Sequence, residues 1–248
     1  MKRFATLTII LLAGALACAQ AQVKKPKSPK EAQAVNAIIQ AQDPDARIKA
    51  ADDLVTNFAD TDFKSFALYL EAEAYAQKGS NEKAIVYGEQ ALQADPKNYQ
   101  ALVLLAKTYA ATTHLNDLDK EEKLTKADKY AHDGLEAVKT AEKPNPNLTD
   151  AQWTEAKNDF NGQLYMAMGI VAIYRNKMDE VTADFDKVAE LDTDPTDLIR
   201  AGRALLDAKK PDQAVVWFDK AANAPKANAQ VKNIANSDKA RAQAMMKK

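Results

Sequence analysis

Gly-Ser-Asn-Glu-Lys-Ala-Ile-Val-Tyr at residues 79–87 decides the fold, together with Glu-Gln-Ala-Leu-Gln-Ala-Asp-Pro at residues 89–96. The first half of this pattern returns as Asn-Lys-Met-Asp-Glu-Val at 176–181 and as Lys-Lys-Pro-Asp-Gln-Ala at 209–214, which indicates a period of 33 or 34 residues. A period of this length predicts stacked helix pairs, none of which buries its apolar face alone. No segment alternates convincingly with period two, so we expect an all-α fold.

The spacing of small and large residues in each copy resembles the tetratricopeptide repeat, a helix pair of about 34 residues. The clearest copy, residues 65–98, matches the family at Leu68, Ala72, Tyr75, Gly79, Ala84, Ala91 and Pro96. Two later copies match at Tyr165, Met168, Gly169, Val181, Phe185 and Val188, and at Leu198, Gly202, Leu205, Ala214, Phe218 and Ala221. The clearest copy departs from the family at Glu71 and Gly88, where Leu and an aromatic residue are expected. The resemblance implies a right-handed superhelical solenoid of antiparallel helix pairs, with four to five repeats.

The same spacing divides the chain into segments. We expect a signal peptide at 1–21, a basic flexible tether at 22–30, a degenerate N-terminal helix pair at 31–62, repeats at 65–98, 99–141, 148–194 and 195–227, and a C-terminal capping helix at 228–248. The second repeat has a lengthened turn at 112–123, because Ala127 lies 43 residues after Ala84. The third has an extended first helix, which Thr149 and Gln152 open with a capping box.

The N-terminus has the features of an export signal. Lys2 and Arg3 precede the uncharged apolar run 4–17, which is shorter than the ~20 residues of a membrane-spanning helix. Small residues at cleavage spacing follow, so we expect an exported protein, periplasmic or secreted. The alternative is that Cys18, in the sequence Ala-Leu-Ala-Cys, is lipidated and anchors the protein at the outer membrane.

Candidate groups for catalysis are scarce. His114 and His132 lack Cys, His or Glu partners at ligand spacing, and no serine lies in a nucleophile motif. Ser65 and Ser80 are better explained as helix caps. The net charge of −1 gives no basic excess for nucleic acid. We therefore expect no enzyme activity, cofactor, metal or nucleic-acid partner.

The resemblance also implies a concave groove lined by the first helix of each repeat. Carried over residue by residue, the groove positions include Phe66, Tyr69, Glu73, Val103, Lys107, Met166, Ile170, Ile199 and Arg203. An apolar groove with a few charges suits an extended or helical peptide. In the two later copies, the alternative is that Ile170, Ile173 and Leu206 pack beneath the terminal helix.

Three functional hypotheses remain open at this point. The first is a non-catalytic protein–protein interaction module or scaffold in the bacterial cell envelope, which binds a peptide or protein segment. The second is a lipid-anchored subunit of an outer-membrane assembly or secretion machinery. The third, of another class, is an envelope enzyme or glycan-binding protein, which would need exposed aromatic platforms or clustered carboxylates that the sequence does not display.

Overall fold

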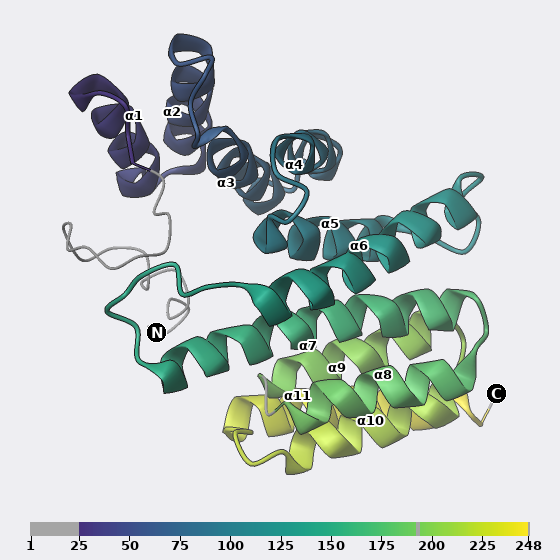
Figure 1. Ribbon diagram of the computed structural model, residues 1–248. Helices are drawn as coiled ribbons and strands as arrows, with labels where there is room; N and C mark the ends of the chain where they lie inside the picture. The colour runs from purple at the N-terminus through teal and green to yellow at the C-terminus, as the bar shows by residue number, and fades with distance from the viewer. Residues whose placement is uncertain (1–24, 192–193, 248) are drawn as a thin grey trace. The chain divides into compact units, whose positions relative to one another are not determined.

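The computed structural model describes residues 25–191 and 194–247, and within these ranges all regular elements are α-helices (Figure 1). The helices are α1 (Pro29–Gln40), α2 (Pro44–Asn57), α3 (Lys64–Gln77), α4 (Asn81–Ala94), α5 (Tyr99–Thr112), α6 (Lys120–Thr140), α7 (Asp150–Tyr174), α8 (Met178–Glu190), α9 (Pro195–Asp207), α10 (Pro211–Asn223) and α11 (Ala229–Met245). The expected all-α fold of successive helix pairs is confirmed.

The helices belong to two compact units. Of the described residues, unit 1 comprises those up to Leu105 together with Thr140–Trp153, and unit 2 comprises Ala106–Lys139 together with those from Thr154 onward. The boundaries between the units fall inside α5 and α7 and before the last residue of α6.

In unit 1, helices α1 to α4 pack one after another. Ile38, Leu54 and Ala67 are fully buried and join α1, α2 and α3 in one apolar cluster. The Ser28 hydroxyl caps α1 by accepting a hydrogen bond from the Glu31 backbone N–H at 3.1 Å. Because α1 begins at Pro29, the last two residues of the expected tether belong to this helix.

In unit 2, aromatic rings from α8 and α10 take part in the core packing. Phe185 and Phe218 are fully buried in a cluster that also contains Trp217 and continues to Val231 on α11. The rings of Phe185 and Trp217 meet edge to face, with their centroids 5.2 Å apart. This geometry is favourable beyond the area that the rings bury.

The long helix α7 follows the sequence-based expectation. The Thr149 hydroxyl accepts a hydrogen bond from the Gln152 backbone N–H at 3.2 Å, and the Gln152 side chain accepts one from the Thr149 N–H at 2.9 Å. This reciprocal pair is the predicted capping box. The Trp153 ring then lies edge-on to Tyr99, the first residue of α5 and hence of the preceding repeat, at 6.2 Å.

The two serines interpreted as helix caps have other roles. The Ser65 hydroxyl is buried inside α3 and donates to the Ala91 carbonyl of α4 at 2.9 Å. It also accepts a hydrogen bond from the Asn98 amide at 2.8 Å, so Ser65 ties together the two ends of the repeat. Ser80 occupies the cap position of α4, but its side chain makes no capping hydrogen bond. The capping interpretation was wrong for Ser65, and for Ser80 it gave the right position but not a capping hydrogen bond.

Two sequence-based expectations concern residues that the structure does not describe, namely the signal peptide and the lipidation of Cys18. Within the described ranges, every helix is too short or too polar to span a membrane.

Candidate functional site

The best-defined candidate surface in unit 1 is a face of α3 that we call the α3 face, formed by Phe66, Tyr69 and Glu73. Their spacing of three and four residues places them on one side of the helix. All three are half-buried, so each side chain keeps some exposure to solvent. Phe66 and Tyr69 pack at the edge of the apolar cluster of α1, α2 and α3. The α3 face therefore offers two anchored aromatic rings beside a carboxylate.

Polar contacts from α2 hold the α3 face in place. The guanidinium of Arg47 lies 3.3 Å from the Glu73 carboxylate and donates a second hydrogen bond to the Ala41 carbonyl at 2.9 Å. The Tyr69 hydroxyl approaches the other Glu73 oxygen at 3.4 Å. Because Arg47 is only 11% exposed, this ion pair is better shielded from water than a fully exposed pair.

Burial raises the pKa of the Tyr69 hydroxyl well above its ordinary value, and the negative charge of Glu73 adds to the rise. Tyr69 therefore stays a neutral hydrogen-bond donor, and its ring is restrained by Glu73. A restrained aromatic residue of this kind loses little conformational entropy when a partner covers it.

The remaining predicted groove residues differ in their exposure. Val103 on α5, Met166 on α7 and Ile199 on α9 are buried, whereas Lys107 and Arg203 are exposed and Ile170 is half-buried. Tyr69 and Val103 belong to unit 1 and Met166 to unit 2, so their alignment along one wall stays a prediction.

The two exposed cationic residues of the predicted groove, Lys107 and Arg203, have partners within the chain. The Lys107 ammonium donates to the Gln163 side chain at 2.7 Å, and the Arg203 guanidinium pairs with Asp238 of α11 at 2.7 Å. Ile173 and Leu206 lie in the apolar cluster that also contains α11 residues, and Ile170 packs against it. Their place in this cluster agrees with the alternative left open by the sequence, in which these three residues belong to the core.

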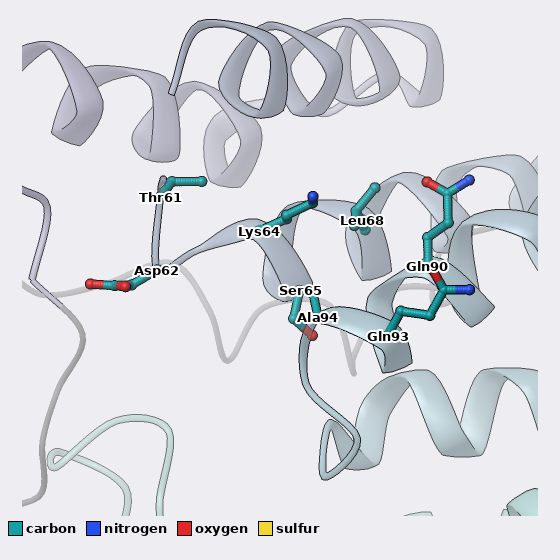
Figure 2. Close-up of a pocket in the computed structure, with 8 residues that line it drawn as sticks. All are labelled: Thr61, Asp62, Lys64, Ser65, Leu68, Gln90, Gln93 and Ala94. Carbon is teal, nitrogen blue, oxygen red and sulfur yellow. The ribbon is translucent and has the colours of Figure 1, made fainter. Parts of the chain in front are cut away.

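A polar pocket of about 650 Å³ lies on another side of α3 (Figure 2). Its lining comes from the α2–α3 connection, the first turns of α3 and the last turns of α4, namely Thr61, Asp62, Lys64, Ser65, Leu68, Gln90, Gln93 and Ala94. Sequence reasoning missed this pocket, because glutamines on a helix surface carry no signal in a single sequence.

Groups with reactive chemistry are scattered in the described part of the chain. No three residues among His, Cys, Asp and Glu are grouped there as metal ligands. His114 and His132 are exposed, and each has a ring nitrogen within 3.7 Å of one carboxylate, Asp117 or Asp128. Burial, with a smaller contribution from Glu180, raises the pKa of Asp184 to about 6.

Comparison with known proteins agrees with this geometry. The model of the tetratricopeptide repeat family matches residues 67–98, which include α4 and nearly all of α3. The fold is similar to the crystal structure of a thermophilic TPR protein from Thermus thermophilus, with a TM-score of 0.54 and 16% sequence identity. That similarity covers 84% of this chain and 98% of the other. No curated protein matches the sequence significantly.

Proposed function

Because this chain is a tetratricopeptide-repeat protein, we propose that it is a non-catalytic interaction module or scaffold in the bacterial cell envelope. Repeats of this kind act as protein-binding surfaces, since stacked helices present an extended face to a partner. The proposed ligand is an extended or helical segment of another protein, held by side-chain anchors.

The observation that supports this proposal is the α3 face. It combines the Phe66 and Tyr69 rings with the Glu73 carboxylate, and the Arg47 contact restrains that carboxylate before any partner arrives. Aromatic residues fixed in this way are typical of the positions that carry most of the binding energy in protein interfaces. A segment with an apolar side chain beside a cation or an amide donor fits this combination.

The test replaces Tyr69 with Ala in the full chain and measures affinity for a partner isolated from envelope extract. We expect the affinity to fall by about 1–3 kcal/mol, because a buried aromatic anchor is lost. Val86→Ala is the matched control, since Val86 is an exposed apolar residue on α4 of the same repeat. Equal affinity of both variants and the parent would place the binding site away from the α3 face. A collapsed helical melt of Tyr69→Ala would assign the ring to the core.

Export is the second part of the proposal and rests on the charged start, the short apolar run and the small residues at 17–21. N-terminal sequencing of the mature protein should begin at Gln20 or Gln22. Retained Met1 in a cytoplasmic fraction would contradict export. A lipid-modified Cys18 would instead support the anchored subunit of an outer-membrane assembly.

A further inference from the structure

The most unusual buried group of unit 1 is Glu71, in the middle of α3. Its side chain is fully buried, and neither carboxylate oxygen has a hydrogen-bond partner. Glu71 stands where the repeat pattern has Leu, so the carboxylate occupies a position that normally fills the core. An unpaired charge at such a place is costly, and the group avoids the cost by keeping its proton.

The groups around Glu71 come from both neighbouring helices. Asp52 on α2 contributes a second negative charge. The Tyr87 hydroxyl on α4 approaches the carboxylate without reaching the geometry of a full hydrogen bond, and together with the Lys83 ammonium it favours the ionised form. The Lys83 ammonium is held over the Tyr75 ring, 5.0 Å from its centroid, and Tyr75 stacks on Tyr87 at 5.2 Å. The Lys83 ammonium is therefore engaged with an aromatic ring and makes no hydrogen bond to the Glu71 carboxylate.

We propose that Glu71 is a proton switch for unit 1. Protonated Glu71 permits the tight packing of α2, α3 and α4, and loss of its proton loosens α3 against both neighbours. The switch lies in the core of the repeat and is distinct from the α3 face, because residue 71 points to another side of the helix from residues 66, 69 and 73.

The expected pH range follows from the pKa. Burial, and then the Asp52 charge, raise the pKa of Glu71 from 4.5 to about 8. Between these values the folded state binds more protons than the unfolded state, so stability falls as the pH rises and levels off above about pH 8. One further consequence rests on the proposed function: α3 also carries the α3 face, so partner affinity falls over the same range.

The experiment is hydrogen exchange of the full chain, followed by mass spectrometry, at pH 5.5 and pH 7.5, with exchange rates corrected for intrinsic pH dependence. We expect protection of the α3 peptide to fall by up to about tenfold per pH unit, the limit for one titrating group. The α10 peptide in unit 2 is the internal reference: any trend that the raised pKa of Asp184 causes there should persist unchanged in Glu71→Gln. Glu71→Gln should abolish the fall, because it removes the titrating group and keeps its shape.

Two more variants sharpen the result. Glu82→Gln removes an exposed carboxylate from the first turn of α4 and should leave the fall intact. Asp52→Asn should make the fall smaller, because Glu71 then ionises at lower pH.

If Glu71→Gln does not fold, Glu71→Leu, which restores the residue of the repeat pattern, is used in place of Glu71→Gln. Protection of α3 that is independent of pH in the parent, or a fall that persists without Glu71, would overturn the switch. Neither outcome requires a partner, so both are separate from a failure of the proposed function.

Discussion

The repeat of unit 1 and the last repeats of unit 2 both pack a glycine against a bulky side chain, but they place the glycine on different helices. In unit 2 the glycine is on the first helix and the aromatic ring on the second, as in the pairs Gly169–Phe185 and Gly202–Phe218. In unit 1 the glycine, Gly88, is on the second helix, and it receives Leu105 from the following first helix. A small residue facing a large one is therefore the requirement, and the helix that supplies each is free to change.

The exchange leaves unit 1 with a different core. Without a ring at position 88, the space between α3 and α4 holds the stacked Tyr75 and Tyr87, together with the carboxylate of Glu71. In unit 2 the fully buried rings of Phe185 and Phe218 fill the corresponding space against Gly169 and Gly202. Unit 2 therefore packs apolar rings at this place in the repeat, whereas unit 1 packs a carboxyl group whose proton, as proposed above, stabilises the unit.

Removing a ring from unit 2 tests this comparison with the largest expected effect. Phe185→Ala should destabilise the protein by about 3–5 kcal/mol, because it leaves a cavity among fully buried neighbours. Tyr87→Ala in unit 1 should cost clearly less, since Tyr87 is only half-buried. Denaturant unfolding of both variants measures the difference. Equal losses would show that the two units do not differ in how much their stability depends on these rings.

Adding a methyl group to each glycine gives the next largest effect. A Cβ at Gly202 would lie 2.5 to 2.8 Å from three atoms of the rigid Phe218 ring. Gly202→Ala should therefore cost about 1–3 kcal/mol. At Gly88 the nearest atom, at 2.9 Å, is the end of the Leu105 side chain, which adjusts more easily.

Gly88→Ala should be close to neutral, because the higher helix propensity of Ala, worth about 1 kcal/mol, offsets the small shift. Thermal unfolding of the two glycine variants side by side measures the contrast. A larger loss at Gly88 than at Gly202 would mean that Leu105 is the more rigid neighbour.

The sequence predicted the architecture because close packing of helix pairs leaves a regular trace of small and large residues. It also predicted where α7 begins, since the Thr149–Gln152 capping box is a local signal. The departures at Glu71 and Gly88 were visible as departures, but their meaning depends on Leu105 and Asp52, which are distant in sequence. Local signals thus located the helices, and tertiary contacts decided what the exceptions do.

In the predicted groove, too, the sequence located the residues and tertiary contacts decided their roles. Position in the repeat located Tyr69 and Glu73 on one face of α3, yet their restraint comes from Arg47, 26 residues before Glu73. Position also selected Met166 and Ile199, which the structure buries. A family position identifies the helix face, whereas the local packing determines how much of it reaches solvent.

The smallest effect is expected in the turn between α5 and α6 of unit 2. There the pKa of a carboxyl group is lowered, whereas the pKa of Glu71 is raised. Asp117 accepts hydrogen bonds from the Lys123 ammonium and the His114 backbone N–H, each at 3.0 Å. These bonds hold the pKa of Asp117 below its ordinary value, with Lys123 the larger cause. Its contribution is therefore present above the ordinary carboxyl range and is lost as the pH falls through the lowered pKa.

The His114 backbone amide signal in an NMR titration measures this contribution directly. We expect the signal to shift only below the ordinary carboxyl range, as protonation of Asp117 weakens the bond. Asp117→Asn should remove that acid step and leave the pH dependence of α3 exchange unchanged, because α3 and the turn belong to different units. Glu71→Gln should do the reverse, abolishing the fall in α3 protection and keeping the acid step at His114. If either variant changed both signals, the two carboxylates would be coupled, and the proton dependence would belong to the whole chain rather than to unit 1.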